Sequence, residues 1–145
     1  MNLIKQQKQT QTDRLAVLRK YGLRGTQARV AVLEALENTQ TPLSHADVAA
    51  CLGDTVFDRA TIFRNLVDMA EAGILSRIDV GDHIWRFEMR NLDAHSHFVC
   101  NDCGDVSCLP DLDLNAQASE VASKYKVGNI SEVLLKGHCE DCGDA

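Results

Sequence analysis

The chain has 145 residues, of which 45% are apolar, and a formal net charge of −6 at pH 7. This length allows one ordinary domain or two small ones, and no apolar run is long enough to span a bilayer. A cytoplasmic protein is expected, because six cysteines without a signal peptide suit a reducing compartment.

The charge is unevenly distributed. Residues 1–90 carry 12 Lys and Arg against 11 Asp and Glu, a net of +1, whereas residues 91–145 carry 3 against 10, a net of −7. This break predicts two domains, 1–90 and 91–145, with a boundary near 91–94. The acidity of the whole chain therefore does not exclude a nucleic-acid-binding role for the first domain.

Local start and stop signals predict the first helices. Residues 1–12 are polar and Gln-rich, and are predicted to be a mobile arm. Asp13 caps a short helix over 14–21, which stops at Gly22. Thr26 is the N-cap of a second helix that runs to about Glu37. The buried stripe expected on this second helix comprises Ala28, Val32, Ala35 and Leu36.

A third helix is predicted between Ser44 and Gly53, because Ser44 and Asp47 form a capping-box pattern. Cys51 lies in this helix and is expected to be a small buried residue.

The fourth helix begins after Asp58 and ends at Gly73. Its inward face is predicted to hold Ile62, Leu66 and Met69, at helical spacing. Its outward face is predicted to hold Arg64, Thr61 and Asp68. A short helix, a brief loop and a second helix with a polar outer face indicate a helix-turn-helix, although a solvated amphipathic helix would show the same pattern.

A two-stranded hairpin is predicted next, over 74–80 and 83–89 with a turn at Gly81-Asp82. Trp85, Phe87 and Met89 alternate with polar residues and are expected on the buried face. Three helices followed by a hairpin predict a winged helix, which favours DNA binding.

Two Cys-x-x-Cys knuckles dominate the second domain. One tight turn can aim both sulfurs of a knuckle at one point, so Cys100, Cys103, Cys139 and Cys142 can enclose a tetrahedral Zn²⁺. A redox dithiol and a pair of disulfides are the alternatives. Four thiolates leave no open position on zinc, which indicates a structural site.

The rest of the second domain is predicted to be α/β. Strands are expected over 98–109, around the first knuckle, and over 127–135. A helix is expected over 112–125, with Leu114, Ala118 and Val121 along one stripe. Cys108 is interpreted as a packing residue beside the first knuckle.

A second metal site is suggested where the two domains join. The pattern His95-x-His97 puts both rings on one side of an extended segment, and Glu88 lies at the end of the predicted wing. Two imidazoles and a carboxylate suit Zn²⁺, Fe²⁺ or Mn²⁺. Solvated surface histidines are the alternative.

Several motifs, taken in order, resemble the ferric uptake regulator family of metal-dependent transcriptional repressors: GLRGTQAR, LSHADV, DRATIFRNL, HSHFVCNDCG and KGHCEDCG. The resemblance implies an α+β fold, with a winged helix joined to a small α/β dimerisation domain. It also implies a homodimer on a palindromic A/T-rich operator. The sequence shows no Gly-rich phosphate loop, no nucleophile motif and no paired acids in a plausible cleft, so an enzyme is not expected. The implied DNA-binding residues are Arg24, Arg59, Thr61, Phe63 and Arg64. Position 63 is usually tyrosine in the family, so Phe63 lacks a hydroxyl.

The resemblance also implies two kinds of metal site. Structural zinc falls on the four knuckle cysteines, and a second divalent metal falls on Glu88, His95 and His97. This second metal is called the effector metal below. Its fourth ligand could be His83, His45, Asp79 or a water molecule. The expected function is a metal-responsive repressor of metal-homeostasis genes. A peroxide-sensing regulator of the same family and a zinc-stabilised thiol redox protein are the alternatives.

Overall fold

The computed structural model describes residues 2–39, 41–53, 57–90, 96–109, 112, 114–130 and 132–143, and the side chains from residue 10 onward. The chain divides into two compact units, residues 1–91 and 92–145. Each unit is described by itself below. Among the described helices, none combines the length and the apolar character needed to cross a bilayer.

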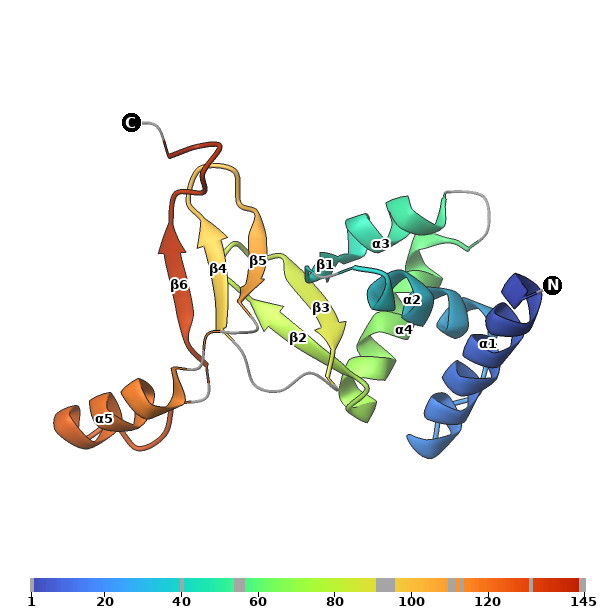
Figure 1. Cartoon of the computed structure of the whole chain (residues 1–145), viewed down its shortest axis with the longest axis horizontal. Coiled ribbons are helices and arrows are strands. Elements are labelled where there is room, and N and C mark those ends of the chain that lie inside the picture. The colour runs from blue at the N-terminus through green and yellow to red at the C-terminus, as the bar shows by residue number, and fades with distance from the viewer. Residues whose placement is uncertain are drawn as a thin grey trace. The chain divides into compact units, whose positions relative to one another are not determined.

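The first unit is a winged helix (Figure 1). Its helices are α1 (Asn2–Lys20), α2 (Gln27–Glu37), α3 (His45–Leu52) and α4 (Arg59–Ala72). Its strands are β1 (Leu43–Ser44), β2 (Leu75–Asp79) and β3 (Trp85–Met89). They form an antiparallel sheet in the order β1-β3-β2. Phe87 of the central strand β3 is paired with Leu43 of β1 on one side and with Arg77 of β2 on the other. The predicted winged helix is confirmed, and β1 adds a strand that the sequence did not indicate.

Helix α1 differs most from the prediction. The expected arm over residues 1–12 and the short helix capped by Asp13 are wrong, because one helix runs from Asn2 to Lys20. This stretch contains no glycine or proline, and its Gln, Lys, Leu and Ala residues favour helix. Extending an existing helix costs less than starting a new one, so the cap signal at Asp13 is overridden.

The other helix ends follow their local signals. The Thr26 side chain accepts from the backbone of Arg29 at the start of α2. Ser44 and Asp47 form a reciprocal capping box at the start of α3. Gly73 ends α4 in the left-handed conformation, with φ of 93°.

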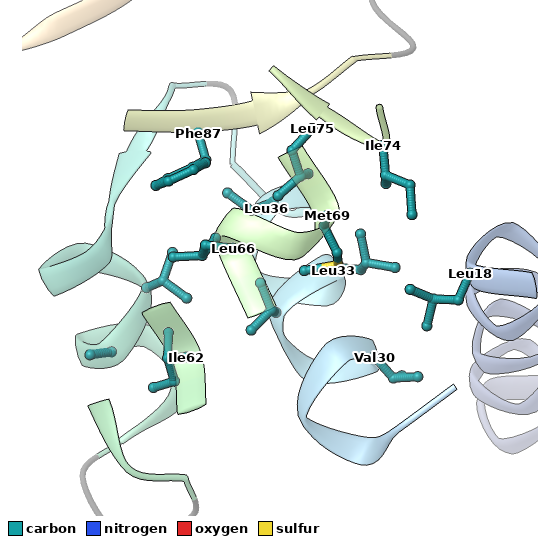
Figure 2. Packing of buried hydrophobic residues seen from close by; sticks show 13 residues of the cluster. Leu18, Val30, Leu33, Leu36, Ile62, Leu66, Met69, Ile74, Leu75 and Phe87 are labelled. Carbon is teal, nitrogen blue, oxygen red and sulfur yellow. The ribbon is translucent and has the colours of Figure 1, made fainter. Parts of the chain in front are cut away.

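The helices and the wing enclose one apolar core (Figure 2). The inward residues Ile62, Leu66 and Met69 of α4 are all buried, as predicted. On α2 the predicted Ala28, Val32 and Leu36 are buried, Ala35 is only partly buried, and Val30 and Leu33 are buried in addition. The core thus fixes α4 against α2 and the sheet, and leaves the opposite side of α4 at the surface.

Trp85 does not lie on a buried face as predicted. Phe87 is fully buried, but Trp85 is 41% exposed and the Arg77 guanidinium lies 3.9 Å from its ring centroid. Trp85 pairs with Asp79 at the outer end of the hairpin, where the strands extend past the core. A cation–π contact with Arg77 covers part of the ring instead.

The second unit has a three-stranded sheet with the order β5-β4-β6 (Figure 1). Its elements are β4 (Ser96–Cys100), β5 (Val106–Leu109), α5 (Asn115–Tyr125) and β6 (Leu134–Gly137). β4 pairs antiparallel with β5 and parallel with β6. The predicted strand over 127–135 is therefore displaced toward the second knuckle, and the predicted helix begins later than residue 112. With both units mixed in this way, the α+β class is confirmed.

Helix α5 buries none of its residues. Of the predicted stripe Leu114, Ala118 and Val121, Leu114 precedes the helix as its N-cap residue. Val121 is 45% exposed and Tyr125, further along α5, is 65% exposed. Within one chain, the apolar side of α5 is left without a covering layer in the described part of the second unit.

Candidate metal centre and nucleic-acid interface

The four knuckle cysteines converge. One sulfur from each of Cys100, Cys103, Cys139 and Cys142 lies within 4.8 Å of the others. The Sγ atoms of Cys103 and Cys139 are 3.8 Å apart. Zinc–sulfur bonds of 2.3 Å in a tetrahedron put neighbouring sulfurs about 3.8 Å apart, whereas a disulfide requires about 2.05 Å. The four thiols therefore fit a tetrahedral zinc ion. All six cysteines lie in the described residues, and none is in a disulfide.

The sheet brings the two knuckles together. The first knuckle is the turn between β4 and β5, where Gly104 adopts a positive φ of 75° and its N–H donates to the Cys100 carbonyl. The second follows β6, which lies parallel to β4 with Gly137 opposite Cys100. A bond of 2.7 Å from the Asn101 N–H to the Gly137 carbonyl extends this pairing into the knuckles. Zinc would thus connect the start of the sheet to its last strand.

Two of the four thiols have strongly shifted acidities, in opposite directions. The backbone N–H groups of Cys103 and then Cys139 donate to the sulfur of Cys100, which lowers the pKa of Cys100 to about 6. Hydrogen bonding with Cys139, followed by burial, raises the pKa of Cys142 to about 12. Zinc binds thiolates, so a zinc ion would displace every thiol proton that remains at the site, including that of Cys142. Cys100 is the thiol best prepared to receive it.

The side of α4 opposite the core carries a basic and aromatic surface. Arg59 and Arg64 are exposed, Phe63 is 41% exposed, and Thr61 is partly buried beside them. The Asp58 carboxylate accepts from the Thr61 N–H at 2.6 Å and begins the helix. This arrangement can contact phosphates through the guanidinium groups and base edges or methyl groups through the other side chains.

Two contacts of Arg29 on α2 hold the loop that carries Arg24 and helix α4 together. Arg29 of α2 donates to the carbonyl of Arg24 at 3.0 Å and pairs with Asp68 of α4 at 3.1 Å. Asp68, predicted on the outer face, is therefore engaged with Arg29. The Arg24 side chain is exposed on the loop that Arg29 holds to α4.

His45 at the start of α3 supports the same helix. Its Nε2 lies 2.8 Å from the Arg59 carbonyl, and its ring meets the ring of Phe63 edge-on, with centroids 5.5 Å apart. Because a carbonyl only accepts, Nε2 must carry the hydrogen. His45, a candidate for the fourth effector ligand, is thus committed to packing α3 against α4.

The other predicted effector ligands lie in both units. Glu88 is on β3 opposite Ser76, and His97 is on β4. His95 lies outside the described residues. His83 is in the turn of the wing with a left-handed φ of 63°, so it does not continue the strand as predicted. The Asp79 carboxylate accepts from the Gly81 N–H in the same turn.

One cysteine differs from its sequence interpretation, and a second lies beside a histidine. Cys51 is exposed on α3 and not buried. Cys108 is directly opposite His97 in the β4–β5 pairing, and a ring nitrogen of His97 lies within 4.8 Å of its sulfur. The sequence contained a signal for this pair. A hairpin centred on the first knuckle, between residues 102 and 103, places position 97 opposite position 108.

The first unit is thus a winged helix with a basic outer surface on α4, and the second is a sheet unit whose four converging thiols could hold a zinc ion. The model of the ferric uptake regulator family matches residues 20–136. The chain belongs to this family, whose members are metal-responsive transcription regulators and not enzymes.

Individual relatives agree with this assignment. The chain is 33% identical over 137 residues to a ferric uptake regulation protein of Shigella flexneri, covering 90% of each chain. It is 29% identical over 127 residues to a zinc uptake regulation protein of Mycobacterium tuberculosis, covering 83% of this chain and 95% of the relative. The solved Vibrio cholerae ferric uptake regulator is similar with a TM-score of 0.71 and 29% identity, over 86% of this chain and 98% of that one.

Proposed function

We propose that this protein is a homodimeric repressor that binds a palindromic A/T-rich operator in double-stranded DNA when a divalent metal is bound. Its targets would be metal-homeostasis genes. The observation that carries the proposal is the exposed surface of Arg59, Phe63 and Arg64 on a helix whose other side is fixed in the core. Residues 1–90 would be the DNA-binding domain and 91–145 the dimerisation domain.

The DNA-binding role is supported by the distribution of charge. The first 90 residues have a net charge of +1 in a chain of −6. Arg64 and Arg59 can contact phosphates or a guanine edge, and Phe63 can contact thymine methyl groups. Arg24 and Thr61 complete the proposed set. Phosphate contacts of this kind make binding salt-dependent.

A structural role for zinc is supported by the convergence of the four sulfurs. The Cys103–Cys139 distance of 3.8 Å matches that between two sulfurs of a tetrahedral zinc site. Zinc held there would lock the end of β6 to the β4–β5 turn, which a small unit with little buried core requires. Substitution of Cys100 by serine should therefore release zinc and unfold residues 91–145.

The effector site is proposed on Glu88, His95 and His97, with Zn²⁺, Fe²⁺ or Mn²⁺ as the metal. Both iron- and zinc-regulation proteins are relatives of the chain, so similarity does not choose between these ions. If Glu88, His95 and His97 bind the same ion, the chain on either side of residue 91 can adopt fewer orientations. A larger fraction of the dimers then holds its two α4 helices in an orientation that can bind DNA, so the metal shifts the population toward the binding form.

A homodimer is supported by α5. Its apolar residues Val121 and Tyr125 are exposed in one chain, and a second copy would cover them. Two α4 helices related by a two-fold axis would read a palindromic site.

The test is operator selection followed by binding measurements. Purified protein with one zinc ion per chain would be used to select sequences from random duplex DNA, with and without Zn²⁺, Fe²⁺ or Mn²⁺. We expect Arg64→Ala to weaken binding of the selected sequence by about ten- to a hundredfold. The double variant His95→Ala, His97→Ala should remain a zinc-containing dimer that no longer responds to metal. If no DNA sequence were selected with any of the three metals or without metal, the proposal would be refuted.

A further inference from the structure

His97 and Cys108 form a cross-strand pair on the sheet of the second unit. β4 and β5 run antiparallel with these two residues directly opposite each other. Opposite side chains in an antiparallel pair project from the same face, with Cβ atoms about 4.5–5.5 Å apart. A ring nitrogen of His97 and the sulfur of Cys108 are within 4.8 Å.

This separation suits two ligands of one metal ion. Zinc–nitrogen and zinc–sulfur bonds in a tetrahedral site place the two donor atoms about 3.6 Å apart. Both side chains can approach that distance by rotating about their own bonds, since the backbone pairing already holds their Cβ atoms together. The pair can therefore supply two of the four donors of a tetrahedral site.

Cys108 is not needed by the structural zinc. The four converging sulfurs belong to the knuckles, and four thiolates already complete a tetrahedral ion. Two residue pairs of the hairpin, Phe98–Ser107 and Val99–Val106, separate His97 and Cys108 from the knuckle. The sulfur of Cys108 therefore faces a different group of donors from those of the knuckles.

We propose that Cys108 is a thiolate ligand of the effector metal beside His97. This inference rests on the proposed function, which assigns His97 to the effector site. The donor set would then contain sulfur as well as nitrogen and carboxylate oxygen. A thiolate favours borderline-soft ions such as Zn²⁺ over Mn²⁺, which prefers oxygen ligands. The site therefore selects Zn²⁺, although Glu88 alone would suit harder ions.

Cobalt substitution tests the sulfur directly. Full-length protein with one zinc ion per chain would be titrated with Co²⁺, and metal content measured to show that the structural zinc stays in place. We expect one further Co²⁺ ion, with a thiolate-to-cobalt charge-transfer band in the near ultraviolet. Cys108→Ser should remove the band and weaken Zn²⁺ binding by at least about tenfold. Cys51→Ser, which alters an exposed cysteine of the first unit, is the matched control.

The outcomes separate this inference from the proposed function. Cobalt binding that restores operator binding without a charge-transfer band, or a band that persists in Cys108→Ser, would overturn the role of Cys108 and leave the effector site standing. No second metal ion and no metal-dependent operator binding would overturn both.

A measurement on the unaltered protein tests the same inference even if the Cys108→Ser variant does not fold. Thiol alkylation of Cys108, followed by mass spectrometry, should be slowed by Zn²⁺ in excess of one ion per chain, whereas alkylation of Cys51 should not change. Equal labelling of Cys108 with and without the added zinc would contradict the inference.

Discussion

The imidazole of His138 lies 2.6 Å from the carboxylate of Asp102. Asp102 is inside the first knuckle and His138 directly precedes the second, so this contact joins the knuckles independently of the cysteines. The hydrogen bond to Asp102, and then the carboxylate charge, raise the pKa of His138 above its usual value. Both side chains are about half exposed, so the contact orients the knuckles more than it stabilises the fold.

Breaking this contact should make the structural zinc easier to remove. Asp102→Asn and His138→Gln are each expected to speed zinc transfer to a chelator by no more than about tenfold, because neighbours of metal ligands act by positioning them. The double variant should resemble each single one, since both remove the same interaction. Transfer can be followed with a colorimetric zinc indicator. Glu140→Gln, which removes an exposed charge inside the second knuckle, is the control, and an equal effect there would indicate charge alone.

Asp58 should give α4 a pH-dependent stability. The Thr61 N–H holds the pKa of Asp58 below its usual 3.8. A carboxyl group whose pKa is lower in the folded state than in the unfolded state stabilises the fold, and this contribution is fully present when the pH is above the unfolded-state pKa. That contribution is lost as pH falls from 3.8 through the folded pKa. Asp58→Asn keeps a capping side chain without the titration, so its melting temperature should vary less than the wild type between neutral and acidic pH. Parallel pH curves for the two proteins would contradict this role.

Substitutions of His45 should weaken DNA binding and leave the packing of the core unchanged. His45→Gln can keep a donor for the Arg59 carbonyl but loses the ring against Phe63, whereas His45→Phe keeps a ring and loses the donor. Each is expected to weaken operator binding by about three- to tenfold, on the order of one hydrogen bond or ring contact. Fluorescence anisotropy would measure the affinity and circular dichroism would confirm the fold. Unchanged affinity in both variants would show that Phe63 needs no support from α3.

The apolar side of α5 should be required for the dimer. Val121→Asp places a charge among residues that a second copy would cover, and is expected to shift the protein toward monomer at micromolar concentration. Ser123→Asp makes the same charge change on another side of α5, where the residue is also exposed, and should leave the dimer intact. Sedimentation equilibrium distinguishes the two. A dimer that survives Val121→Asp would place the interface elsewhere.

The sequence by itself determined the features that depend on a few neighbouring residues. Thr26, the Ser44–Asp47 box, Asp58 and Gly73 each set a helix end through hydrogen bonds within one turn, and the structure has them where the sequence put them. Two residues between the cysteines likewise predicted that both sulfurs of one knuckle point to one place, whereas the meeting of the two knuckles depends on the pairing of β4 with β6. The helix caps and the turn of each knuckle are local, so no knowledge of the rest of the fold was needed for them.

The tertiary structure decided what depends on partners distant in the chain. Exposure of Trp85 and of the α5 face follows from where the core ends, and not from the alternation of residues along one element. The pairing of His97 with Cys108 follows from strand register, which is set between segments. Burial and register are properties of packed surfaces. A pattern within one segment states which faces could be buried, and only the neighbouring segments decide which of them are.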